Sequence, residues 1–187
     1  MRDRYEVIMA GIGGQGVLTS GRLLAEVAVD KYEHVTWMSS YRAARRGGAS
    51  ECTVIISQDE IASFVLSKSD VVMVMASSQL ETFQKRVRPG GVLIYESSGF
   101  SKEINQSDIQ LLPVNAMEIA NSIGAVQAGN MIFLGLYVWM TGVVSKNLID
   151  EKLESQFKDK ALKMNKEAFE KGIEIGKNRG LQPESMR

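Results

Sequence analysis

The sequence predicts an α/β protein built on a doubly wound, mainly parallel sheet of about six strands, with a helical C-terminal extension. Short, fully apolar runs alternate with helical or irregular segments, and such runs are typical of parallel strands buried on both faces. The first run ends in a glycine-rich turn that leads into a helical pattern. With 187 residues the chain can bury one sizeable core, and no repeat or long linker divides it. We therefore expect one domain over residues 1–187.

The first half of the chain supplies most of the expected strands. Residues 5–10 (YEVIMA) form the first apolar run, and small or apolar residues recur at helical spacing over about 15–30. Residues 34–38 are rich in β-branched and aromatic side chains, which favour a strand. The remaining segments are predicted as a loop over 39–48, a strand over 51–57, a weak helix over 61–66, a strand over 71–76, and a helix over 77–87 that Pro89-Gly90-Gly91 ends.

The second half changes from strands to helices. Strands are expected at 92–96 and 109–114, and helices begin at 115–123. The apolar segment 131–144 is predicted to pack on the sheet or at a subunit interface. Apolar residues then recur at steps of three and four over 145–179, which indicates amphipathic helices. We predict a Rossmann-like core over 1–145 and a helical tail over 146–187 that packs on the sheet or on a neighbouring subunit.

Composition excludes several classes of protein. Lys plus Arg and Asp plus Glu both number 22, so no global charge favours nucleic acid or an anionic membrane. A single cysteine, Cys52, excludes an internal disulfide or a self-contained iron–sulfur cluster, and the single histidine, His34, has no cysteine or second histidine with which to hold zinc. The longest apolar stretch is shorter than the roughly 20 residues of a membrane span. We expect a cytoplasmic, reduced protein without a secretory leader.

The first motif that carries chemistry is the glycine turn Gly11-x-Gly13-Gly14-x-Gly16. Glycine tolerates positive φ, and a turn of this kind exposes backbone amides beside a helix N-terminus, where a phosphate group can bind. The alternative is that these glycines only form a tight turn between strand and helix. A dinucleotide site would also need an acid at the end of the second strand to hold the ribose. That strand ends in Ser39-Ser40, and Glu33 lies at its start, so an ordinary nicotinamide-dependent dehydrogenase is disfavoured.

The second motif is Ser40-Tyr41 followed by Arg45-Arg46-Gly47-Gly48. It follows the second strand, at the edge where open α/β sheets bind ligands. Arginine binds phosphates and carboxylates with two donors at once, and paired glycines let the backbone approach. A solvated basic loop, or one that pairs with a partner subunit, explains the same residues equally well.

The order of these motifs resembles the gamma subunits of 2-oxoacid:ferredoxin oxidoreductases. The resemblance rests on the first strand with GIGGQG, the Ser-Tyr and Arg-Gly-Gly loop, the strand Ser50–Ser57 (SECTVIIS), and Gly129–Gly135 (GNMIFLG), which is similar to the family's Asn-Met-x-x-Leu-Gly segment. It covers residues 5–145. The Ser-Tyr and Arg-Gly-Gly residues resemble members that use 2-oxoglutarate, although pyruvate, branched-chain and indolepyruvate relatives share much of the pattern.

The resemblance implies a role within a larger enzyme. Such enzymes decarboxylate a 2-oxoacid on thiamine diphosphate, pass electrons through iron–sulfur clusters to ferredoxin and release an acyl-CoA. Thiamine diphosphate, magnesium and the clusters are then expected on alpha, beta and ferredoxin-like delta subunits, while the gamma chain packs against them and admits coenzyme A. A second copy of this chain is a further candidate partner. The chain alone is not expected to be active.

One part of the loop departs from the family pattern. In the family the loop usually reads Ser-Tyr-Gly-x-Glu-x-Arg-Gly-Gly. In this chain Arg42 replaces the glycine and Ala44 replaces the glutamate. A contact through that carboxylate is lost and the loop becomes more basic, which affects the choice of 2-oxoacid more than the family.

The candidate residues for contact with coenzyme A or phosphate lie in the two motifs. They are Gly11, Gly13, Gly14, Gln15, Gly16, Ser40, Tyr41, Arg46, Gly47 and Gly48. Gln15 is expected to touch either a bound group or a partner chain, and Asn130 to cap the following helix. Cys52 is expected to be a small buried residue in a strand. A stand-alone Rossmann oxidoreductase and a scaffold with an empty turn remain the alternatives.

Overall fold

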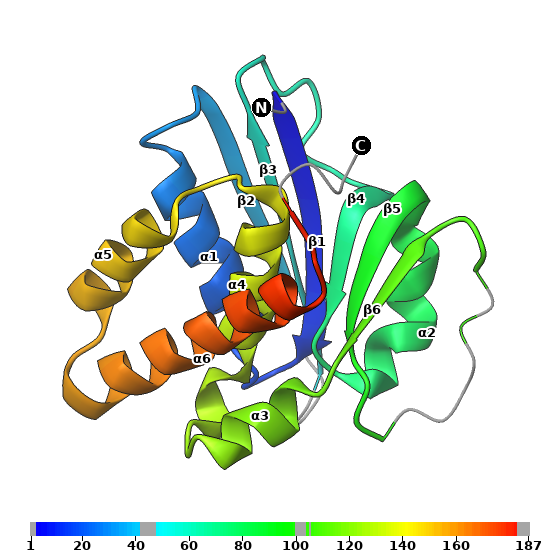
Figure 1. Cartoon of the computed structure of the whole chain (residues 1–187). Coiled ribbons are helices and arrows are strands. Elements are labelled where there is room, and N and C mark those ends of the chain that lie inside the picture. The colour runs from blue at the N-terminus through cyan, green and yellow to red at the C-terminus, as the bar shows by residue number, and fades with distance from the viewer. Residues whose placement is uncertain (1–2, 42–47, 100–103, 105, 183–187) are drawn as a thin grey trace.

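The computed structural model describes residues 3–41, 48–99, 104 and 106–182, and a six-stranded sheet forms its centre. The strands lie in the order β2-β3-β1-β4-β5-β6 (Figure 1). Their bounds are β1 Arg4–Ile12, β2 His34–Tyr41, β3 Ala49–Ser57, β4 Ser69–Val74, β5 Val87–Glu96 and β6 Gln110–Val114.

Five of these strands run in one direction and β3 runs against them. β1, β4, β5 and β6 pair in parallel, whereas β3 pairs antiparallel with both β1 and β2. The expectation of a mainly parallel sheet is confirmed. β3 also separates β2 from β1, so the carboxyl end of β2 does not lie directly beside that of β1, where a dinucleotide fold holds the ribose.

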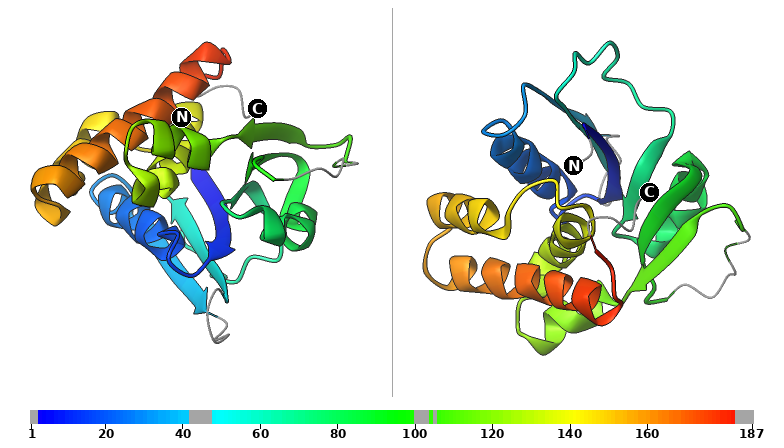
Figure 2. Two further views of the ribbon diagram at one scale, coloured as in Figure 1. Left: turned by 90° about the horizontal axis from the view of Figure 1, so that it is seen from below. Right: turned by 45° about the horizontal axis from the view of Figure 1, so that its top comes forward.

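Helices cover the two faces of the sheet unequally (Figure 2). The larger layer contains α1, α3, α4, α5 and α6, and the other face carries α2 with its flanking 3₁₀ turns. Their bounds are α1 Val17–Ala28, α2 Leu80–Phe83, α3 Ala116–Ser122, α4 Gly129–Thr141, α5 Lys146–Gln156 and α6 Asp159–Asn178. Among the helices described, none is long and apolar enough to cross a bilayer.

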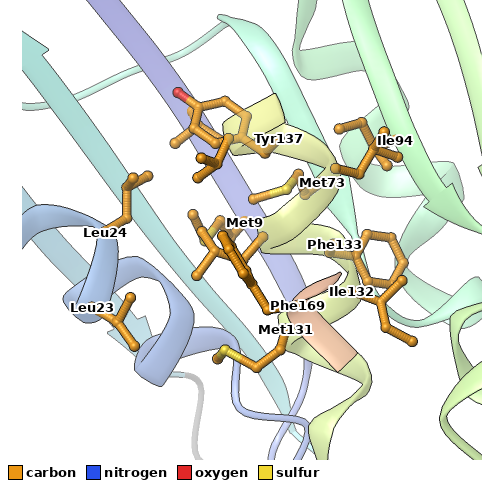
Figure 3. Close-up of a cluster of buried hydrophobic side chains, with 14 of the residues drawn as sticks. Met9, Leu23, Leu24, Met73, Ile94, Met131, Ile132, Phe133, Tyr137 and Phe169 are labelled. Atoms are coloured by element: carbon orange, nitrogen blue, oxygen red, sulfur yellow. The ribbon is translucent and has the colours of Figure 1, made fainter. Parts of the chain in front are cut away.

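The main core lies between the sheet and the larger helical layer. Figure 3 shows side chains of β1, β4, β5 and α1 converging on α4, with Phe169 of α6 reaching the same cluster. Tyr137, Phe133 and Phe169 are its largest fully buried side chains. Burying such a side chain contributes about 1.5–3 kcal/mol, so the central position of α4 follows from its nearly continuous apolar sequence.

The C-terminal helix α6 crosses α4 at very short range. A Cβ added to Gly135 would lie 2.1 Å from the carbonyl oxygen of Phe169, and one added to Gly172 would lie 2.1 Å from that of Ile132. Glycine therefore lets the two backbones touch. At its far end α6 is held by Trp139, whose Nε1 donates a hydrogen bond to the carbonyl of Leu181 at 2.7 Å.

Several local predictions differ from the structure. The segment 39–48 was expected to be a loop, but β2 continues to Tyr41, because β3 pairs with it along its whole length. The residues Pro89-Gly90-Gly91 belong to β5, where Gly90 adopts φ 76°. No helix forms over 61–66, where tertiary contacts outweigh a weak helical propensity. The helix expected over 77–87 is formed in part, as two 3₁₀ turns on either side of the four-residue α2, and it ends at Arg86.

Candidate functional site at the carboxyl edge of the sheet

A cavity of about 250 Å³ lies where the chain leaves β1, β4 and β5 at their carboxyl ends. This is the edge at which open α/β sheets bind ligands, since β1 and β4 send their connections to opposite sides. The cavity is lined by Gly14, Gln15, Met75, Glu96, Ala116, Met117, Val126, Gln127, Gly129, Asn130 and Phe133. Two predicted residues, Gly14 and Gln15, thus belong to a real concavity.

The glycine turn has the geometry that its sequence predicts. Gly16 precedes the first turn of α1 with φ 75°, and Gly14 has φ 93° with no atom within 4 Å of an added Cβ. Gly11 is required for a different reason, because a Cβ there would lie 2.6 Å from Oε1 of Gln15. Gly14 therefore offers open space in front of the turn, while Gly11 and Gly16 are closely packed.

Gln15 fastens the turn to two strands of the sheet. Its Oε1 accepts a hydrogen bond from the amide of Ile12 at 2.9 Å, and its Nε2 donates to the carbonyl of Met75 at 3.1 Å. Gln15 thus has a structural role within the chain as well as a place in the lining of the cavity. A single side chain here joins the ends of β1 and β4.

Several amides of the turn are already engaged within the chain. The amide of Gly13 donates to the carbonyl of Gly48 at 3.1 Å, and that of Gln15 donates to the carbonyl of Ile12 at 3.2 Å. The first bond brings the end of the second motif against the first, as expected if the two act together. It also leaves fewer donors for an anion than the bare glycine pattern implies.

Asn130 was expected to cap α4, and that prediction was wrong. It is the second residue of α4, and its Nδ2 donates to the carbonyl of Gly16 at 3.1 Å and to Oγ of Ser20 at 2.9 Å. Asn130 thereby ties the start of α4 to the first turn of α1. The partner is distant in the sequence, so local capping rules could not find it.

Glu96 is the polar residue of the cavity that the sequence analysis missed. It ends β5 and is 2% exposed. Its carboxylate accepts hydrogen bonds from the amide and hydroxyl of Ser98 and from the amide of Met117, which lies in the first turn of α3. An acid that directly follows an apolar strand at the carboxyl edge was the available signal. The carboxylate would repel a phosphate placed deep in the cavity.

The second motif is divided by the structure. Gly48 is buried beside the turn, whereas Ser40 lines a separate hollow of about 280 Å³ with Glu51 and Arg86. Tyr41 is the last residue of β2. Arg46 and Gly47 lie outside the described residues. The two motifs are therefore joined only through Gly13 and Gly48 within the part of the chain that the structure describes.

Cys52 and His34, the single cysteine and the single histidine of the chain, both lie in strands of the sheet. Cys52 is buried in β3 as expected, and burial raises the pKa of its thiol to about 12. His34 begins β2 and is half-buried. Across the described ranges no group of three or more His, Cys, Asp or Glu side chains is arranged to hold a metal ion.

Comparison with known proteins identifies the family. The sequence profile described as pyruvate ferredoxin/flavodoxin oxidoreductase matches residues 6–175. The chain belongs to this family. The resemblance drawn from the glycine turn, the Ser-Tyr and Arg-Gly-Gly loop and the Gly129–Gly135 segment is confirmed.

Relatives within the family come in two lengths. The ketoisovalerate oxidoreductase subunit VorA of Methanothermobacter thermautotrophicus is 32% identical over 171 residues, or 90% of this chain and 35% of the relative. The 2-oxoglutarate synthase subunit KorC of Methanothermobacter marburgensis is 30% identical over 182 residues, or 92% of this chain and 96% of the relative. The chain thus spans about a third of the first relative and nearly all of the second.

A solved family structure has the same fold. The gamma subunit of a keto/oxoacid ferredoxin oxidoreductase from Geobacter sulfurreducens superposes with a TM-score of 0.79 at 28% identity, covering 95% of this chain and 98% of that one. The carboxyl-edge cavity therefore lies in a fold shared with a gamma-type subunit of the family.

Proposed function

We propose that this chain is the gamma-type subunit of a 2-oxoacid:ferredoxin oxidoreductase and is inactive without its partner subunits. The observation that carries the proposal is the family match over residues 6–175. The reaction converts a 2-oxoacid and coenzyme A to an acyl-CoA and carbon dioxide, with the electrons passing to ferredoxin. Thiamine diphosphate supplies the stabilisation of the carbanion left by decarboxylation. In this proposal, that cofactor, its magnesium and the iron–sulfur clusters belong to the partner alpha, beta and delta subunits. The assembly is proposed to be cytoplasmic.

The proposed substrate is 2-oxoglutarate. Support comes from the 2-oxoglutarate synthase subunit KorC, which matches this chain over 96% of its own length, and from Ser40-Tyr41 with Arg46-Gly47-Gly48. The branched-chain relative matches over only a third of its length.

The proposed contribution of this chain is a surface that contacts coenzyme A. Its phosphates suit the open side of the turn at Gly13 and Gly14 and the guanidinium of Arg46, and not the cavity interior, where Glu96 opposes an anion. The cavity is also smaller than the roughly 300–1,000 Å³ of most ligand sites, so only a narrow, uncharged part of the coenzyme would enter. The carboxylate of Glu96 and the apolar side chains of Met75 and Phe133 suit an amide-containing chain.

The strand order speaks against the alternative of a nicotinamide-dependent enzyme. In a dinucleotide fold the acid that holds the ribose lies at the end of the strand beside β1. Here β2 is separated from β1 by β3, which runs the other way and presents its amino end at this edge. The ribose-binding position is therefore missing in both sequence and topology.

The assembly is tested by native purification under anaerobic conditions. The tagged chain is isolated from cells that produce the complete set of subunits, and the eluate is assayed for coenzyme A-dependent viologen reduction with several 2-oxoacids. We expect thiamine-binding and iron–sulfur subunits to co-purify, with 2-oxoglutarate the best substrate. A chain that elutes alone and inactive would contradict the proposed assembly, and preference for another 2-oxoacid would contradict only the substrate.

The coenzyme A contact is tested with a matched pair of glycine variants. Gly14 and Gly90 both have positive φ and open space around an added Cβ, but they lie at opposite ends of the sheet. Gly14→Ala is expected to raise the KM for coenzyme A on the order of tenfold, since it places a methyl group where the phosphates approach, while Gly90→Ala leaves it unchanged. Equal KM values for the two variants would argue against contact at the turn.

A further inference from the structure

The edge strand β2 offers a long, unprotected row of backbone groups. It has eight residues, pairs only with β3, and forms one end of the sheet (Figure 1). An edge strand uses half of its N–H and C=O groups for its neighbour, and the remainder point outward. Such an edge is a template for another strand unless the protein blocks it.

The opposite edge of the sheet shows what a blocked edge looks like. β6 has only five residues and contains Pro113, which has no N–H to donate. Its carbonyl accepts a hydrogen bond from Nη2 of Arg179 at 2.5 Å. β2 has no proline and no Asp, Glu, Lys or Arg, and its eight residue pairs with β3 run without a bulge. The usual devices against edge-to-edge pairing are absent from this described strand.

Apolar side chains are exposed on both faces of β2 at its centre. Trp37 is 37% exposed on the face that carries α1, beside a hollow of about 410 Å³ lined by Leu18 and Phe157 among others. Met38 is 39% exposed on the opposite face, beside the hollow of about 280 Å³ that also contains the exposed Phe64 and Val65. A strand laid along β2 would meet a hollow on each face, with Trp37 exposed beside one and Met38 beside the other, as in β-strand addition. The hollows also contain charged residues, Arg22 on the face of Trp37, and Glu51 and Arg86 on the face of Met38.

We propose that β2 is the interface with a second copy of this chain, paired antiparallel with its own counterpart into a continuous sheet. The strand is self-complementary. It carries no Asp, Glu, Lys or Arg, so no like charges meet, and a two-fold axis beside Met38 places this apolar side chain against its own counterpart. The polar residues Ser39 and Ser40 then lie opposite the other half of the partner strand. No residue of β2 lines the carboxyl-edge cavity, although Ser40 and Tyr41 also belong to the proposed coenzyme A surface. The dimer is measured without an activity assay, so the proposed function and this interface can fail separately.

The test uses reciprocal charges at the centre of the interface. The purified full-length chain is examined by sedimentation equilibrium alongside Met38→Lys and Met38→Glu. We expect the unaltered chain to dimerise, and each variant to weaken the dimer on the order of tenfold or more, because two like charges meet across the axis. Mixing the two variants should restore dimers, since Lys then faces Glu.

A matched control separates this surface from a general effect of charge. Val29→Lys places the same charge on another exposed apolar residue, at the end of α1, and should leave the dimer intact. Thermal unfolding checks that all variants fold. The proposal is overturned by a monomeric unaltered chain, by equal weakening in Val29→Lys, or by a mixture of the Met38 variants that stays monomeric. Dimers that persist in both Met38 variants overturn it as well.

Discussion

Glycine permits close approach at two places in this chain, the turn between β1 and α1 and the crossing of α4 and α6. At the turn, the space that a Cβ would need is occupied by side-chain ends: Oε1 of Gln15 beside Gly11, and Nδ2 of Asn130 at 2.5 Å beside Gly16. At the crossing, a Cβ added to Gly135 or Gly172 would lie 2.1 Å from a backbone carbonyl oxygen of the other helix. Side chains can rotate away, whereas a helix backbone can move only with the whole helix.

The difference shows that the recognisable motif is not the most constrained part of the molecule. The glycine turn attracts attention because it resembles a phosphate-binding pattern, but the crossing admits even less substitution. The crossing also serves the site indirectly. It fixes α4, and the first turn of α4 supplies Gly129 and Asn130 to the cavity lining. The helix α6 thus helps to position a cavity to which residues from the N-terminal turn also contribute.

The largest expected effect is at the crossing. Gly135→Ala should lower the free energy of unfolding by about 3 kcal/mol, because the methyl group overlaps the carbonyl of Phe169 and forces the helices apart. Gly129→Ala is a control in the same helix, where a Cβ meets only atoms at 3.9 Å. It should change stability by less than about 1 kcal/mol, in the stabilising direction. Urea unfolding followed by circular dichroism compares the two, and similar losses would contradict the distinction.

An intermediate effect is expected at the turn, with non-additivity as its signature. Gly16→Ala should cost about 2 kcal/mol, through its positive φ and through displacement of Asn130. Asn130→Ala should cost about 1–3 kcal/mol by removing its hydrogen bonds to Gly16 and Ser20. In the double variant the clash disappears, so the combined loss should be smaller than the sum of the two. Strict additivity in urea unfolding would show that Asn130 does not feel the added methyl group.

A smaller effect is expected where glycine has space but an unusual φ. Gly14→Ala should destabilise the chain by about 1–2 kcal/mol from backbone strain alone, with no clash to relieve. Gly90→Ala, at φ 76°, should lose a similar amount. Unfolding midpoints in urea provide the measurement. A much larger loss of stability in Gly14→Ala than in Gly90→Ala would contradict the open space around an added Cβ at Gly14.

The smallest expected effect concerns Cys52 of β3, whose Sγ packs against Gly21 of α1. Burial raises the pKa of this thiol to about 12, so the folded state keeps its proton while the unfolded chain loses it above about pH 8.5. The contribution to stability is complete below that pH and is lost as the pH rises toward the folded pKa. By about pH 9.5 the free energy of unfolding should fall by about 1 kcal/mol relative to Cys52→Ala. Identical pH profiles for the two proteins would contradict this.

The sequence by itself determined the fold class, the strand–turn–helix opening and the family. These depend on local pattern: apolar runs predict buried strands, glycines at fixed spacing predict a turn with positive φ, and the order of motifs points to the gamma subunits. The burial of Cys52 followed from the same reasoning, since a small apolar residue in a strand covered by other elements has little chance of reaching solvent.

Only the tertiary structure decided how distant segments meet. Neither the insertion of β3 between β1 and β2 nor the bond from Gly13 to Gly48 follows from local pattern, because strand order depends on which pairing buries the most surface. Asn130 and Glu96 acquired their roles from partners far along the chain or across a turn, and Gly135 and Gly172 from a helix crossing. Hydrogen bonding and close packing act over a few ångströms in space, and separation in sequence does not limit them.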